Sequence, residues 1–86
     1  MKAAKLVAWN LRRLRVRRSL SQEDLAADAN VDRSYVGRLE RGQENPTVGI
    51  LERIAAVLDA ELIEFFRAPG KNELPPRPLR GGRQRR

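Results

Sequence analysis

The sequence predicts an all-α fold, a compact bundle of five helices over residues 1–66 followed by a basic, disordered tail over residues 67–86. Apolar residues recur at helical spacing before the tail, and no stretch of the sequence alternates as a strand would. Residues that typically begin and end helices separate these periodic stretches. From Pro69 onward the chain has four prolines and three glycines but few large apolar residues, so burial cannot offset the entropy of ordering.

The first helix is expected at about residues 3–18, where the residues at helical spacing include Val7, Leu11 and Leu14. Ser21 is a natural N-cap for a second helix, because its hydroxyl can accept a hydrogen bond from a free amide of the first turn. Asn30 is expected to end that helix, since asparagine tolerates the left-handed conformation better than most residues.

The third helix is expected at about residues 33–41, with Asp32 as its N-cap and Gly42 as its C-terminal stop. Thr47 should cap a fourth helix that carries a strong apolar stripe. A short fifth helix is expected at about residues 61–66.

The net charge of +7 is unevenly distributed along the 86 residues. Residues 1–41 carry +5, residues 42–66 carry −4 and residues 67–86 carry +6. A basic face indicates a polyanionic partner such as nucleic acid, although a solvated charged surface is the simpler alternative.

The composition also excludes several function classes. The chain has no cysteine and no histidine, which removes disulfides, thiol chemistry, imidazole catalysis and the usual zinc sites. No pair of carboxylates stands in a recognisable metal or acid–base motif, so neither an enzyme nor a cofactor is expected. With no apolar run of membrane-spanning length and no signal-peptide pattern, the prediction is a cytoplasmic protein without membrane association.

Residues 22–41 predict a helix-turn-helix, because two short helices are joined by a tight turn at residues 30–32. In that motif the second helix enters the DNA major groove. Arg33 and Arg38 are long enough to reach guanine O6 and N7, and Ser34 can bond several bases. Arg41, at the end of the helix, is better placed for a phosphate.

The span from about residue 11 to residue 66 resembles the Xre/Cro-type family of DNA-binding domains. The likeness is carried by LRRLRVRRSLSQEDLA, VDRSYVGRLERG and NPTVGILERIAAVLDAEL. The third-helix pattern with a short acidic fifth helix is also similar to the controller proteins of restriction–modification systems. The resemblance implies a lambda-repressor-like fold and a homodimer that binds a palindromic operator in double-stranded DNA. It further implies a prokaryotic regulator, located with the nucleoid at its operator, for which no small-molecule effector is expected.

Family positions map onto this chain residue by residue. The family's glutamine at the start of the second helix contacts phosphate, and Gln22 matches it. Its base-reading positions match Arg33, Ser34 and Arg38. Tyr35 matches a tyrosine that touches the DNA backbone or a thymine methyl, although it could instead cover the edge of the core.

Two further expectations concern the ends of the third helix. The resemblance implies a structural ion pair between Arg15 and Glu40. The following loop lacks the cation that relatives often carry, which leaves Gln43 and Asn45 as weaker donors to the DNA backbone.

The fifth helix has four apolar residues in five, and these cannot all face inward on one short helix. We expect the surplus at a homodimer interface, with the intramolecular core as the alternative. A rival interpretation of the whole chain is a protein-interaction module, such as an antitoxin or adaptor with the same fold. The expected interface residues are Leu62, Ile63, Phe65 and Phe66.

Overall fold

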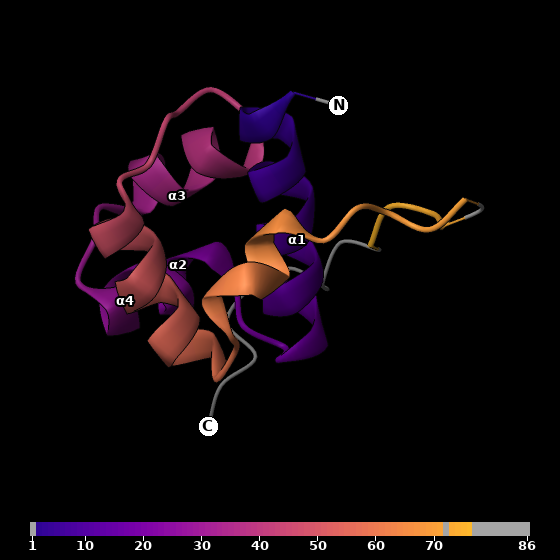
Figure 1. Ribbon diagram of the computed structural model, residues 1–86. Coiled ribbons are helices and arrows are strands. Elements are labelled where there is room, and N and C mark those ends of the chain that lie inside the picture. Colours follow the sequence, from indigo (N-terminus) through magenta and orange to yellow (C-terminus); the bar gives the residue numbers. More distant parts are fainter. Residues whose placement is uncertain (1, 72, 77–86) are drawn as a thin grey trace.

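The protein is represented by a computed structural model that describes residues 2–71 and 73–76. Within that part of the chain all regular structure is helical, which confirms the predicted fold class (Figure 1). The expected short fifth helix is a 3-10 helix, and the first α-helix ends one residue earlier than expected. The elements, in chain order, are α1 (Ala3–Arg17), α2 (Gln22–Ala29), α3 (Arg33–Glu40), α4 (Val48–Leu58) and η1 (Leu62–Phe66).

The five elements form a closed ring of contacts around one apolar core. α1 packs against α3, α3 against α2, α2 against α4, and η1 lies between α4 and α1, as Figure 1 shows. Each element contributes an apolar side chain to the same cluster, so none of them buries its apolar face alone. The large side chains that are fully buried include Leu11, Leu14, Leu25, Val36, Leu39, Ile54, Leu58 and Phe65.

The N-caps follow the sequence with one difference. Ser21 accepts a hydrogen bond from the Asp24 amide at 2.9 Å, and Thr47 accepts one from the Ile50 amide at 3.1 Å. Asp32 occupies the N-cap position of α3 but directs its carboxylate to the Ser34 hydroxyl. Asp32 is therefore at the expected N-cap position, but its carboxylate accepts a hydrogen bond from the Ser34 side chain.

Each of the four α-helices is followed within two residues by a residue with a positive φ angle. Asn30 and Gly42 were expected in this role, whereas Ser19 (φ 56°) and Asp59 (φ 52°) were not. In each case the following residue donates its amide to a carbonyl five residues earlier, as Leu20 does to Arg15 at 3.2 Å. These bonds satisfy helix-end carbonyls and turn the chain sharply, which keeps the connections between helices short.

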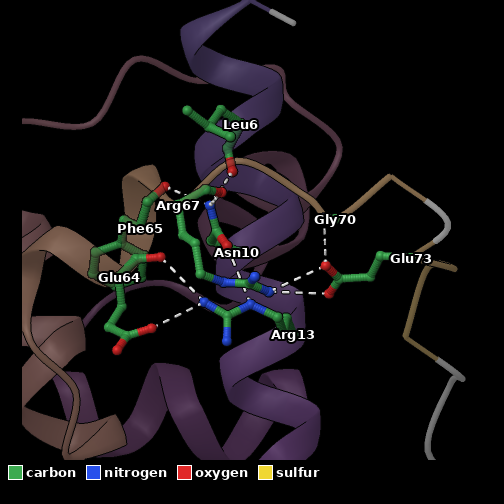
Figure 2. Close-up of polar contacts among 8 residues, drawn as sticks. All are labelled: Leu6, Asn10, Arg13, Glu64, Phe65, Arg67, Gly70 and Glu73. Carbon is green, nitrogen blue, oxygen red and sulfur yellow. Dashed lines mark hydrogen bonds and ion pairs between the residues drawn. The ribbon is translucent and has the colours of Figure 1, made fainter.

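Asn10 of α1 is fully buried and ties the end of η1 to α1 (Figure 2). Its Nδ2 donates to the carbonyl oxygens of Phe65 at 2.9 Å and Arg67 at 2.8 Å. Its Oδ1 accepts from Nε of Arg13 at 3.2 Å, and Nη2 of Arg13 donates to Oε1 of Glu64 at 3.1 Å. This network satisfies carbonyls that a short 3-10 helix leaves free, and so it fixes η1 against α1.

Part of the predicted tail continues from this network. Arg67 pairs with Glu73 at 3.0 Å, and Glu73 also accepts the Gly70 amide at 2.8 Å (Figure 2). Pro75 and Pro76 then lie beside α1. The prediction for residues 72 and 77–86 lies outside the described part of the chain. Among the residues that are described, no helix has the length and apolar character needed to span a membrane.

The backbone at Ser19 gives a test of the helix-end account. Ser19→Gly should raise the free energy of unfolding by about 0.5–1 kcal/mol, because glycine adopts positive φ without the clash that a Cβ causes. Urea denaturation followed by circular dichroism measures the change. Ala27→Gly is the matched control in the exposed face of α2, and it should lower the free energy of unfolding by about 1 kcal/mol. A loss of stability in Ser19→Gly would contradict the account.

Candidate nucleic-acid interface

The orientation of α3 is set by a buried ion pair at its last residue. Nε and Nη2 of Arg15 donate to the two carboxylate oxygens of Glu40 at 2.5 and 3.0 Å, so the expected pair is present. The side chains of Arg15 and Glu40 are only 7% and 4% exposed. Nη1 of Arg15 donates to the Leu20 carbonyl at 2.8 Å, and Nε2 of Gln22 donates to Oε1 of Glu40 at 3.0 Å. One carboxylate therefore joins α3 to α1 and to the first residue of α2.

The turn between α2 and α3 is held from both sides. Asn30 takes the left-handed conformation, and the Val31 amide donates to the Ala26 carbonyl at 2.9 Å. Arg53, from α4, donates to the Asn30 carbonyl at 2.9 Å. Ala26 is nearly fully buried between the helices, so its small side chain allows their close approach. These contacts make residues 22–40 a helix-turn-helix whose second helix is fixed at both ends.

The outer face of α3 is a shallow, open depression of about 540 Å³. Gly37 forms its floor, and a Cβ at that position would meet Arg41 Nη1 at 3.4 Å and Gln22 Oε1 at 3.8 Å. Gly37 is thus covered by those two side chains. The depression is lined by Gln22, Asp32, Arg33, Ser34, Gly37, Arg38 and Arg41.

Most of the residues predicted to contact DNA meet at this depression. The two arginines predicted to read bases, Arg33 and Arg38, lie there with Ser34, and so do the two predicted phosphate contacts Gln22 and Arg41. Nε2 of Gln22 has two hydrogens, of which one is donated to Glu40, so the other can be donated to a phosphate. The arrangement combines rigid donors with long cationic side chains, as recognition of base edges and phosphates requires.

The remaining predicted contacts are placed differently. Tyr35 is half-buried against the core, and burial raises the pKa of its phenol, with the negative charge of Glu44 adding to the effect. Gln43 is exposed and accepts a hydrogen bond from Nε of Arg41 at 3.2 Å. Asn45 lines a separate hollow next to Phe66, away from the depression. Tyr35 and Gln43 therefore contact arginines that line the depression, Arg38 and Arg41 respectively, whereas Asn45 lies on another surface.

Two carboxylates that were not predicted to be part of the DNA-binding site accept hydrogen bonds from residues that line the depression. Glu44 accepts Nε of Arg38 at 2.7 Å, and Asp32 accepts the hydroxyl of Ser34. That hydrogen bond from Ser34 is the main reason why the pKa of Asp32 lies below its ordinary value of 3.8. A signal for Glu44 was present in the sequence, because Gly42 turns the chain back and brings the next residues toward the helix they follow.

The four apolar residues predicted at a dimer interface do not share one environment. Phe65 is 0% exposed and belongs to the chain's own interior, whereas Leu62 is partly buried and packs against the edge of the same core. The Phe65 side chain points inward because η1 closes the core between α1 and α4. Ile63 and Phe66 are 75% and 47% exposed. The expectation is therefore corrected for Phe65, and it remains a prediction for Leu62, Ile63 and Phe66.

A third exposed apolar residue, from α4, lies close to Phe66. Val48 is 65% exposed and lines the same hollow as Phe66, and Phe66 lines a second hollow with Ile63. Val48, Ile63 and Phe66 are called the apolar patch below. The sequence did not indicate Val48, because it is the first residue of its helix and lies off the main stripe.

Comparison with known proteins agrees with this geometry. Residues 11–65, from within α1 into η1, match the HTH_3 family, described as helix-turn-helix. The chain belongs to that family. The predicted Xre/Cro-type resemblance is thereby confirmed, and since the family consists of transcriptional regulators, so is the expectation that the chain is not an enzyme.

Individual relatives cover most of the chain. An uncharacterised HTH-type transcriptional regulator, y4dJ of Sinorhizobium fredii, is 39% identical over 65 residues, which are 76% of this chain and 84% of that protein. The restriction-modification controller protein C.AhdI of Aeromonas hydrophila is 43% identical with a TM-score of 0.71, covering 73% of this chain and 91% of its own. The controller protein C.Esp1396I was solved as a tetramer in complex with its natural 35-base-pair operator. It is 32% identical with a TM-score of 0.70, covering 77% of this chain and 87% of its own.

The buried ion pair gives a test of how α3 is held. Glu40→Ala should lower the free energy of unfolding by about 3–5 kcal/mol, because it leaves the Arg15 guanidinium buried without its counter-charge. A loss of that size is a large part of the stability of a small domain. Chemical denaturation measures it. Arg18→Ala is the control, since it breaks an exposed pair with Asp59 and should cost less than about 1 kcal/mol. Equal losses in the two variants would show that burial of the Arg15–Glu40 pair is unimportant.

Proposed function

We propose that the protein is a sequence-specific, DNA-binding transcriptional regulator that acts as a homodimer on a palindromic operator in the cytoplasm of a prokaryote, at the nucleoid. The observation that carries this proposal is the depression on α3, where cations surround a shallow surface on a helix braced at both ends. Membership of the helix-turn-helix family and the operator complex of the related C.Esp1396I support it.

In the proposed mechanism α3 enters the major groove and reads base edges there. Arg33 and Arg38 bind guanine O6 and N7, and Ser34 bonds a neighbouring base. Gln22 and Arg41 bind phosphates on either side, which fixes the register of the helix without reading sequence. The protein performs no reaction; it changes transcription by occupying DNA that other proteins need.

The proposed homodimer forms through the apolar patch. Val48, Ile63 and Phe66 form an exposed apolar surface of the kind that marks protein interfaces. A second copy is the favoured occupant, because a palindromic operator requires two recognition helices related by a two-fold axis. The two α3 helices should then lie about 34–36 Å apart, the distance of one DNA turn.

Base reading is tested with duplexes selected from a random pool by the wild-type protein. Arg33→Ala and Arg38→Ala should each weaken binding to the selected duplex by about 1–3 kcal/mol and relax discrimination at one base pair per half-site. Fluorescence anisotropy on a set of singly changed duplexes measures both effects. Arg18→Ala is the control: it removes one positive charge at a site outside the depression, and it should leave discrimination unchanged.

If Arg33→Ala or Arg38→Ala loses affinity equally for every duplex, that arginine contacts phosphate. If no duplex is enriched, the protein is better explained as a protein-interaction module.

Assembly is tested by placing a charge in the apolar patch. Ile63→Glu should convert the dimer to a folded monomer, because Ile63 is 75% exposed and contributes little to the core of one chain. Sedimentation velocity reports the mass, and circular dichroism reports the helical content. Leu74→Glu is the matched control, since Leu74 is 80% exposed but outside the patch, and it should remain dimeric. A wild-type protein that is monomeric at high micromolar concentration would rule out the proposed dimer.

A further inference from the structure

The end of α3 is folded so that Glu44 returns to the helix it follows. Gly42 has φ +74°, and the Gln43 amide donates to the Arg38 carbonyl at 3.0 Å. This bond brings the chain back over the last turn of α3 and places Glu44 next to Arg38. The contact is therefore produced by the backbone at the helix end, and it does not depend on a chance meeting of two long side chains.

Arg38 is held by two groups at once. Its Nε donates to Oε2 of Glu44 at 2.7 Å, the length of a charge-assisted hydrogen bond. Its guanidinium carbon lies 5.8 Å from the centre of the Tyr35 ring, within the range of a cation–π contact. Tyr35 is itself packed against the core, so it offers a fixed platform. Arg38 nevertheless keeps 41% of its side chain exposed and lines the α3 depression.

The nitrogen of Arg38 that donates to Glu44 determines which edge of the guanidinium stays available to DNA. With Nε bound to the carboxylate, the remaining donors are those of Nη1 and Nη2, which lie at the far end of the planar group. Two parallel donors at that end suit the O6 and N7 acceptors of guanine in the major groove. A held side chain also loses less conformational freedom on binding than a mobile one.

We propose that Glu44 is a positioning residue for sequence recognition, which fixes Arg38 so that its terminal nitrogens read a guanine in the major groove. The inference rests on the proposed function, in which Arg38 reads a base. It adds a specificity determinant that lies outside the recognition helix and carries a charge opposite to that expected of a DNA contact.

Glu44 could have the opposite effect through its charge alone. A carboxylate close to DNA repels phosphates, and an ion pair within the protein competes with the DNA for Arg38. Under that account, removal of Glu44 would strengthen binding to every duplex. The two accounts therefore predict opposite signs for the same substitution.

The experiment compares Glu44→Ala and Glu44→Gln with the full-length wild-type protein on the selected duplex and on its singly changed variants. Glu44→Ala should weaken binding to the selected duplex by up to about tenfold, because Arg38 would then have to lose the freedom of a mobile side chain when it binds. It should relax discrimination at the same base pair as Arg38→Ala does. Glu44→Gln keeps an acceptor oxygen without the charge and should lie between Glu44→Ala and the wild type.

The double variant Arg38→Ala/Glu44→Ala separates positioning from an independent effect. It should bind no more weakly than Arg38→Ala alone, because a residue that acts through Arg38 has nothing to position once Arg38 is gone. Glu52→Ala, which removes an exposed acid of α4, is the charge-matched control and should leave discrimination unchanged. Thermal melting checks that each variant is folded.

Three outcomes would overturn the inference. Tighter binding of Glu44→Ala to all duplexes would identify Glu44 as a competitor for Arg38. An undiminished effect of Glu44→Ala in the Arg38→Ala background would show that it acts independently of Arg38. A wild-type protein without sequence preference would overturn the proposed function itself, and the inference with it, whereas the first two outcomes leave sequence-specific binding intact.

Discussion

The ion pair between Arg15 and Glu40 connects α1 to the end of α3, and α3 can present a fixed surface only if the positions of these helices are fixed. Burying two charges is costly, and the cost is offset only when the geometry is close to ideal and the remaining polar atoms are bonded. Both conditions hold here, because the pair is bidentate and its other donors and acceptors reach Leu20 and Gln22. Replacement by well-packed apolar residues could be equally stable, but it would not connect α1, α2 and α3 through directional bonds. The directional bonds of the ion pair therefore fix the orientation of α3 relative to α1 and α2.

The cationic face of α3 depends on acids as well as on arginines. Asp32 and Glu44 each hold one residue of that face, Ser34 and Arg38 respectively, at the two ends of the helix. These carboxylates reduce the general attraction of the surface for polyanions, while they limit the conformations of the groups that would read sequence. Under the proposed function, this arrangement would favour discrimination between duplexes over affinity for DNA in general. The apolar patch lies on different elements, α4 and η1, so it leaves this face free.

The sequence predicted the features that depend on local chemistry. The caps at Ser21 and Thr47 and the stops at Asn30 and Gly42 follow from residue type, and so the helices were located to within about a residue. Contacts between segments far apart in the sequence could not be predicted as well. Periodicity could not assign the inward face of η1, since five residues in a 3-10 helix do not define a stripe, and Phe65 was placed on the wrong side. The roles of Asn10 and Glu44 depend on carbonyls and side chains brought close only by the fold.

On the proposed function, α3, held by the buried ion pair, is the surface that meets DNA. Nuclear magnetic resonance of the ¹⁵N-labelled protein, titrated with a duplex selected from a random pool, tests it most directly. The largest changes in chemical shift should fall on the amides of α3 and on the Gln22 side-chain amide, whose nitrogen is bonded to Glu40 in the free protein. Amides next to Ile63 should change little, because the apolar patch and the α3 depression are lined by different residues. Changes concentrated on α4 and η1, with α3 unaffected, would contradict the account.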